Sequence, residues 1–311
     1  MSKNLCGVYL FHKPKSVSSH SVVSGIRKCL KVNGLELKVG HLGTLDPFAD
    51  GLLPILIGGA TRLTDFLHQE TKQYLFTIQF GKETTTLDPY GETVLEKEVP
   101  DDLGAVTLAI KDQFIGKIEQ VPPAYSALKV NGRPLYEYMR TVGKLPIDIQ
   151  EKKREVQIHS LEIVSIDDEK HAATFRAVCS KGTYIRSLAR DIAYACHTCG
   201  YCLELTREKI GPWSMENLEK FEFPLPTEKI WEDMIGHIIP AEKLFPEFPV
   251  LKLSDEKQNH FFIHGNAVTL NGSWDSKYLF VYGINDEVLF LCEQKKISPN
   301  ETQILPKIKM Y

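Results

Sequence analysis

The sequence predicts an α+β fold, because strand periodicity and helix periodicity both recur along its 311 residues. Alternating apolar side chains in Gly7–His12, and aromatic and β-branched side chains in Gln73–Phe80, predict strands. Apolar residues at helical spacing predict a helix over Ser18–Val32 with a serine as its N-cap. Arg154–Ile166 and Ala172–Cys179 are expected to pair as antiparallel strands.

The other expected elements follow in chain order. Gly40–Gly51 is expected to be a loop, and Leu52–Ile57 a short buried strand. Further helical patterns occupy Thr61–His68, Asp101–Phe114, Pro134–Arg140 and the later part of Tyr184–Ala195, which begins strand-like. Prolines in Val121–Lys129 exclude a central helix or strand there.

The C-terminal part is expected to be a small β-rich module. Trp213–Phe245 is rich in proline and charged residues and is interpreted as a connection, which places the boundary near Pro240. The chain then divides into residues 1–239 and 240–311. Four short strand patterns follow the boundary, at Val250–Leu253, Ala267–Leu270, Tyr278–Ile284 and Val288–Cys292.

Composition bounds the class of protein. No apolar run of about 18 residues occurs, and the first residues lack a signal-peptide or transit pattern, so a cytoplasmic protein is expected. Seven cysteines, an odd number, favour reduced thiols over a disulfide framework. The net charge of −3 is unlike that of a nucleic-acid binder. However, Lys and Arg outnumber Asp and Glu by eight to three in Met1–Arg62 and by twelve to eight in Ala124–Arg190, which indicates either one positive face or ordinary surface charge.

The segment Gly40–Leu53, GHLGTLDPFADGLL, is the most informative in the chain. Glycines allow close backbone approach to a ligand, and Pro47 stiffens the chain directly after Asp46. Local chemistry leaves two interpretations of Asp46: a carboxylate held in a site, or the N-cap of a short helix with Pro47 at its first position.

This segment, with Gly58–Arg62 after it, closely resembles the signature of the TruB family of tRNA pseudouridine synthases. Further matches occur in the family's order over about two-thirds of the chain: Lys13-Pro14, Lys72–Tyr74, Pro122–Lys129, Lys181–Arg186 and Leu205–Arg207. Two positions depart from the pattern, since Ser16 stands where the family usually has glycine and Thr85 replaces an aspartate. The resemblance implies a curved, mixed, mainly antiparallel sheet with flanking helices and a central catalytic cleft.

The resemblance also implies a reaction and a catalytic set. Family members detach uracil from the ribose at N1, turn the base and rejoin it through C5, with no metal or other cofactor. Asp46 matches the nucleophile, and Arg186 matches the arginine that holds it. Tyr74 corresponds to the tyrosine that packs on the base and assists proton transfer.

Substrate-binding roles are carried over in the same way. Tyr184 lies two residues before Arg186 in a strand-like run, so both side chains are expected on one face. Leu205 matches a leucine of the uracil pocket, and His41 matches the histidine that stacks in the T-loop beside the flipped base. The ordinary alternatives are a packed tyrosine, a core leucine and a structural loop histidine.

The implied partner is tRNA, bound by its T-arm and modified at uridine 55, with no membrane, no required protein partner and a monomeric enzyme. An RNA-gripping insertion is expected at about 122–153, and residues 240–311 weakly resemble a PUA-like RNA-binding module. Basic side chains in position for phosphate contacts, or simply solvated, are Lys13, Lys129, Arg133 and Arg140.

Other functions remain open at this point. A non-catalytic tRNA-binding or tRNA-folding protein would not need both Asp46 and Arg186, and a guide-RNA-dependent synthase would carry a clearer terminal module. A glycosidase would need a second acid, for which Asp50 is a formal candidate. The cysteines of Cys196–Cys202 have no second distant pair of ligands, so a zinc site is rejected in favour of small buried side chains.

Overall fold

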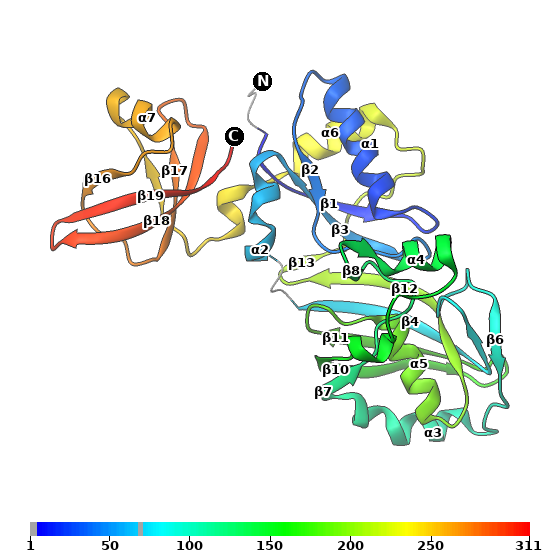
Figure 1. Ribbon diagram of the computed structural model, residues 1–311. Coiled ribbons are helices and arrows are strands. Elements are labelled where there is room, and N and C mark those ends of the chain that lie inside the picture. Colours follow the sequence, from blue (N-terminus) through cyan, green and yellow to red (C-terminus); the bar gives the residue numbers. More distant parts are fainter. Residues whose placement is uncertain (1–4, 68–70) are drawn as a thin grey trace.

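The computed structural model describes residues 5–67 and 71–311. Within these ranges a ten-stranded mixed sheet forms the larger part, and a five-stranded sheet stands beside it (Figure 1). None of the described helices combines the length and apolar character needed to cross a membrane.

The large sheet is mainly antiparallel, as expected. Its order is β14 (Ile239–Pro240), β1 (Gly7–Lys13), β3 (Asp50–Ile57), β12 (Gly200–Ile210), β4 (Lys72–Phe80), β11 (Ala172–Cys179), β10 (Arg154–Asp167) and β7 (Gly116–Gln120). Two short strands join its sides: β2 (Val39–His41) pairs with β3, and β13 (Trp213–Ser214) pairs with β12. The parallel contact is between β12 and β3, where Thr206 and Arg207 lie opposite Asp50 and Gly51. That contact places Thr206 and Arg207 beside the start of β3, where the segment that contains Asp46 ends.

Helices cover the sheet at two places. α1 (Ser19–Val32) and α6 (Thr227–His237) lie side by side near β1, whereas α3 (Leu103–Ile110) and α5 (Ile185–Ala195) lie at the other end (Figure 1). The side chain of Ser18 accepts a hydrogen bond from the Ser21 amide, so the predicted N-cap of α1 is confirmed. Shorter elements are η1 (Gly58–Leu63), α2 (Thr64–Leu67), η2 (Lys111–Phe114), α4 (Leu135–Val142), η3 (Ile149–Lys152), η4 (Ala241–Leu244) and the small hairpins β5–β6 (Lys82–Thr84, Thr93–Glu96) and β8–β9 (Lys129–Val130, Arg133–Pro134).

Several expected elements differ in form. The helix expected over Asp101–Phe114 is an α-helix that tightens into a 3₁₀ turn at Lys111. The helix expected over Thr61–His68 begins as 3₁₀ structure and is helical to Leu67, while His68 lies outside the described residues. Interpreting Trp213–Phe245 as a mere connection was wrong, because α6 buries Ile230 and Met234 completely in the core. The apolar residues of α6 form only a narrow stripe between prolines and charged residues, so the sequence pattern did not indicate a helix.

The second sheet contains the four strands expected after Pro240. Its order is β15 (Val250–Lys252), β17 (Tyr278–Tyr282), β18 (Val288–Ser298), β19 (Glu301–Lys309) and β16 (Val268–Asn271), with α7 (Glu256–Ile263) beside it. Phe280 and Leu291 from this sheet belong to the same hydrophobic cluster as Leu56 and Leu63. The two sheets are therefore joined by buried apolar contact.

Candidate active site

Asp46 lies in the segment between β2 and β3, in a turn rather than at the start of a helix. The Ala49 amide donates to the Asp46 carbonyl at 3.2 Å, which closes the turn around Pro47, and β3 begins at Asp50. The N-cap interpretation of Asp46 was therefore wrong. The carboxylate is about one-third exposed and caps no helix.

The backbone around Asp46 is held by buried side chains. Arg207, almost fully buried, donates from Nε to the Leu52 carbonyl at 2.9 Å, and from its terminal nitrogens to the carbonyls of Gly43 at 2.9 Å and Thr44 at 3.4 Å. Ser19 exchanges hydrogen bonds with the Leu45 backbone at 2.9 Å. The loop is thus fixed on both sides of the carboxylate.

Glycine is required at one end of this loop. Gly51 has φ of +105°, and a Cβ there would lie 2.5 Å from the Arg207 carbonyl oxygen. Because β3 and β12 approach closely at Gly51, the Arg207 side chain on β12 reaches the backbone around Asp46.

Lys13 is a structural residue, so its expected role as a phosphate contact was wrong. Its side chain is fully buried, and Nζ donates to the carbonyls of Val17 at 2.7 Å and Pro14 at 2.8 Å, and to that of Pro47 at 3.4 Å. Burial lowers the pKa of Lys13 to about 8. Sequence alone gave no sign that this cation faces inward.

Ser16 explains one departure from the family pattern. It has φ of +64°, in the left-handed region that favours glycine, and its amide donates to the Pro47 carbonyl at 2.7 Å. The chain therefore keeps the turn that a glycine would make there. The Ser16 hydroxyl also lies 2.9 Å from the Tyr90 hydroxyl.

Arg186, itself buried, forms an ion pair with the partly exposed carboxylate of Asp46. The Nε of Arg186 lies 2.8 Å from Asp46 Oδ2, and the arginine is only 3% exposed. Its other nitrogens donate to the carbonyls of Thr86 at 2.6 Å and Tyr125 at 2.9 Å. The guanidinium is therefore fixed by partners on separate segments, and it fixes the Asp46 carboxylate in turn.

Asp88 is a charged residue of the site to which the sequence analysis gave no role. Its Oδ2 lies 3.4 Å from Arg186 NH1, while Oδ1 accepts from the Thr86 hydroxyl at 2.6 Å and the Tyr90 amide at 3.0 Å. Burial raises the pKa of Asp88, and the nearby Asp46 charge adds to this, against the opposing effects of Thr86 and Arg186. Asp88 lies three residues after Thr85, where the family pattern departs, and this position alone did not indicate its contact with Arg186.

A pocket of about 280 Å³ collects five of the six predicted site residues. Asp46, Tyr74, Tyr184, Arg186 and Leu205 all line it. Basic side chains on the same walls, none of them predicted as site residues, are Lys72, Arg154, Lys181 and Arg207. A pocket lined by one carboxylate and several cations is suited to a ligand that carries phosphate.

Two aromatic residues and a leucine shape this pocket. Tyr74 on β4 is 7% exposed, and burial raises the pKa of its phenol, which keeps it protonated at neutral pH. Leu205 on β12 is 5% exposed. The Tyr184 ring is covered by the Arg154 guanidinium, 4.6 Å from the ring centroid, and its backbone exchanges hydrogen bonds with the Gln120 side chain at 2.7 and 3.0 Å.

The expected strand geometry of Tyr184 and Arg186 was wrong, although both reach the pocket. Helix α5 begins at Ile185, so Tyr184 precedes it and Arg186 lies in its first turn. Apolar residues at helical spacing along α5 are buried and outweigh the strand-like start of the segment.

His41, the sixth predicted residue, ends β2 opposite Ile55 and does not line this pocket. Asp50, the formal second acid, also lies outside it. Its Oδ1 accepts from the Thr206 hydroxyl at 2.6 Å, and its Oδ2 is 3.8 Å from His12. Although burial raises the pKa of Asp50, its interactions with nearby His12 and with the Thr206 hydroxyl outweigh that effect and bring the pKa below its ordinary value.

The cysteines of Cys196–Cys202 are buried and bond to different groups. Cys196 Sγ lies 3.7 Å from the Thr107 hydroxyl, Cys199 Sγ lies 3.6 Å from the Leu95 carbonyl, and Cys202 Sγ lies 3.3 Å from the Glu204 carbonyl. Burial raises the pKa of all three thiols. Across residues 5–67 and 71–311, no group of three or more His, Cys, Asp or Glu side chains could hold a metal ion.

Comparison with solved structures identifies the fold. A chain of a Cbf5–Nop10–Gar1 complex matches with a TM-score of 0.63 at 24% identity, over 97% of this chain and 84% of that one. A chain of an H/ACA ribonucleoprotein bound to a substrate RNA containing 2′-deoxyuridine matches with a TM-score of 0.63 at 22% identity, over 98% and 85%. These likenesses concern the fold, which is that of the pseudouridine synthases.

The family follows from sequence comparison. The model of the TruB family pseudouridylate synthase (N terminal domain) matches residues 27–185. A protein of Rickettsia felis named tRNA pseudouridine synthase B is 34% identical over 89% of this chain and 78% of its own length, and its namesake from Oceanobacillus iheyensis is 42% identical over 70% and 69%. The chain belongs to the TruB family.

Proposed function

We propose that this chain isomerises uridine to pseudouridine in tRNA, at position 55 in the T-loop. Membership of the TruB family and the names of its relatives support the reaction and the substrate. The observation that carries the assignment to residues is the ion pair between Asp46 and Arg186, at 2.8 Å, inside a pocket lined by Tyr74 and Leu205.

In this reaction the bond from uracil N1 to ribose C1′ breaks and a bond from C5 to C1′ forms. The proton on C5 leaves and N1 gains one, so the product is an isomer of the substrate. Asp46 acts as the nucleophile that divides this exchange into two easier steps. Attack on the ribose, attack on the base and removal of a ribose proton are all compatible with a carboxylate in this place.

The surrounding residues support that role by their contacts. Arg186 stabilises the negative charge of Asp46 and fixes its direction. Tyr74, kept neutral by burial, packs against the base and assists proton transfer at C5. Tyr184 and Leu205 form the other walls for the uracil ring.

The target uridine must leave its stack to reach Asp46. Residues outside the pocket are therefore needed to bind the RNA around the flipped base. His41 occupies the stack beside the flipped base. Residues 122–153 grip the T-arm through exposed cations, and residues 240–311 form a PUA-like RNA-binding module attached to a catalytic domain of residues 1–239. The enzyme acts as a monomer in the cytoplasm and needs no protein partner.

The proposal is tested by tritium release from tRNA labelled at C5 of uridine, with the purified chain alone. We expect release without guide RNA or added cofactor. Asp46→Asn should abolish it while tRNA binding stays within about tenfold, because one carboxylate contributes little to phosphate contacts.

Asp50→Asn is the matched control, since Asp50 is a nearby carboxylate outside the pocket, and it should release tritium at a near-normal rate. Normal turnover by Asp46→Asn would refute the catalytic assignment. Release that appears only after addition of a guide RNA would favour the guide-dependent alternative, and binding without release would favour the non-catalytic one.

A further inference from the structure

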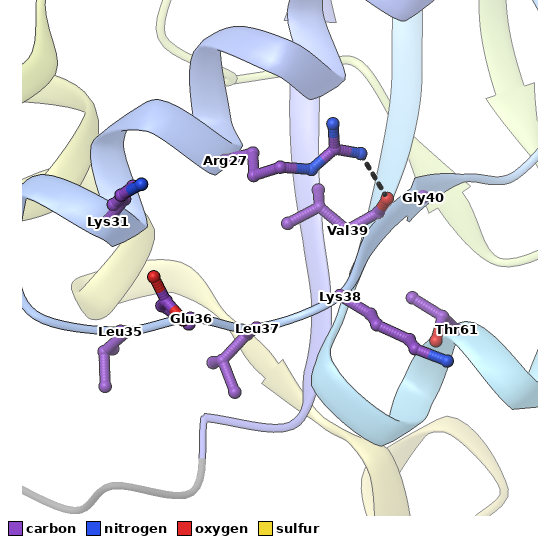
Figure 2. Close-up of a pocket in the computed structure, with 9 residues that line it drawn as sticks. All are labelled: Arg27, Lys31, Leu35, Glu36, Leu37, Lys38, Val39, Gly40 and Thr61. Atoms are coloured by element: carbon purple, nitrogen blue, oxygen red, sulfur yellow. Dashed lines mark hydrogen bonds between the residues drawn. The ribbon is translucent and has the colours of Figure 1, made fainter.

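A second hollow, of about 550 Å³, lies between α1 and the segment that leads into β2. Figure 2 shows Arg27 and Lys31 on the helix side, and Lys38 beside Thr61 on the other side. We call this hollow the α1–β2 groove. It shares no lining residue with the pocket that holds Asp46.

The α1–β2 groove is positively charged. Arg27, Lys31 and Lys38 line it, against the single acid Glu36. These three cations are exposed, and none makes an ion pair within 4.0 Å with any residue of the described ranges. Their charge is therefore available to an anion from outside the chain.

Arg27 is held in place without being neutralised. Its NH2 donates to the Val39 carbonyl at 3.4 Å, a contact marked in Figure 2. This bond ties α1 to β2 and leaves other N–H groups of the guanidinium for a ligand. Leu35 and Leu37 add partly buried apolar surface, against which a sugar ring can pack.

The groove lies a short way along the chain from the proposed active site. Gly40 lines the groove and Gly43 lines the Asp46 pocket, and three residues span at most about 10 Å. His41, assigned to the vacated stack, lies between them. An RNA strand whose uridine enters the pocket therefore has backbone within reach of the groove.

We propose that the α1–β2 groove binds the sugar–phosphate backbone of the RNA whose uridine occupies the Asp46 pocket. This rests on the proposed function, and it adds a phosphate site on α1, separate from the insertion of residues 122–153. Arg27 and Lys31 contact phosphate from the helix, and Lys38 contacts it from the opposite side. Such contacts contribute affinity and register without reading base identity.

The test compares two variants on one helix. Arg27→Ala combined with Lys31→Ala removes both groove cations, whereas Lys28→Ala removes an exposed cation of α1 that does not line the groove. The dissociation constant for unmodified tRNA is measured by filter binding across a salt series. Urea unfolding of each variant verifies that the fold is intact.

We expect the double variant to bind tRNA about 3- to 30-fold more weakly, with the slope of log K against log salt reduced by about 1.5, for two lost phosphate contacts. Its tritium release at saturating tRNA should stay within about twofold of the parent rate. Lys28→Ala should bind with the parent affinity and slope.

Unchanged affinity and slope in the folded double variant would overturn the proposal, and so would an equal loss in Lys28→Ala. A groove that serves an acidic protein would give the first of these results. The measured quantity is tRNA binding, which does not depend on catalysis. A parent protein that binds tRNA without releasing tritium would therefore contradict the proposed function and leave the groove proposal intact.

Discussion

The loop around Asp46 and residues 122–153, the proposed insertion, use basic side chains in opposite ways. Beside the loop, Lys13 and Arg207 are almost fully buried and donate to backbone carbonyls. In the insertion, Lys129 and Arg140 are exposed, and Arg133 pairs with neighbouring Glu137 at 3.1 Å while its guanidinium covers the Tyr138 ring.

Basic side chains near the site therefore have two separate roles, one in stability and one in RNA binding. Buried cations hold the backbone that carries Asp46, so removing one should damage the fold and the rate together. Exposed cations are available to RNA phosphates and contribute little to stability. Substitutions on the two sides should therefore separate stability from affinity.

The largest effect is expected from Arg207→Ala. It leaves the carbonyls of Gly43, Thr44 and Leu52 without their donor in a buried place, which should cost about 3–5 kcal/mol of unfolding free energy and slow tritium release by about 100-fold. Urea denaturation and single-turnover release are the measurements.

Arg176→Ala is the control for that variant. Arg176 on β11, which β4 separates from β12, pairs with Glu208 at 2.9 Å but is about one-third exposed, so its loss should cost less than about 1 kcal/mol. Equal losses of unfolding free energy in Arg207→Ala and Arg176→Ala would contradict the claim that buried cations stabilise the fold more than exposed ones.

Asp50→Asn is expected to have a smaller, pH-dependent effect. The pKa of Asp50 in the folded chain lies below its ordinary value of 3.8, so its stabilising contribution is present above that value and is lost as pH falls through the folded pKa. The variant should be about 1 kcal/mol less stable at pH 7. The difference should shrink below pH 3.8, the ordinary pKa of Asp50, when chemical denaturation is followed over the acidic range. A difference that grows toward low pH would contradict this sign.

The smallest effect on stability is expected in the insertion. Lys129→Ala should change the unfolding free energy by less than about 0.5 kcal/mol, because the side chain is exposed. Its tRNA dissociation constant should rise by about 2- to 10-fold, with a salt slope lower by about 0.7 to 0.9. A folded variant with unchanged affinity at every salt concentration would show that this cation does not contact RNA.

Sequence periodicity predicted the main strands and α1 because their apolar faces are regular. It missed α6, and it missed β12 as a long central strand, although β12 carries both Leu205 and Arg207. Four consecutive polar or charged residues, Thr206–Lys209, interrupt the apolar alternation of β12 by which a strand is recognised, and Arg207 among them is buried to hold the loop.

Five of the six predicted site residues line one pocket because family motifs, rather than periodicity, selected them. The same motifs could not show that Lys13 faces inward, since a lysine near the surface and a buried lysine look alike in sequence. Nor could they assign Asp88, whose contact with Arg186 joins segments about a hundred residues apart. Such contacts depend on tertiary packing alone.

The central claim is that Asp46 and Arg186 act as one unit, and a double-mutant cycle tests it most directly. Asp46→Glu, Arg186→Lys and their combination are compared by single-turnover tritium release from tRNA labelled at C5 of uridine. We expect the combined variant to be about as slow as the slower single variant, since either change already breaks the pair. Losses that multiply, as in two independent sites, would contradict the account.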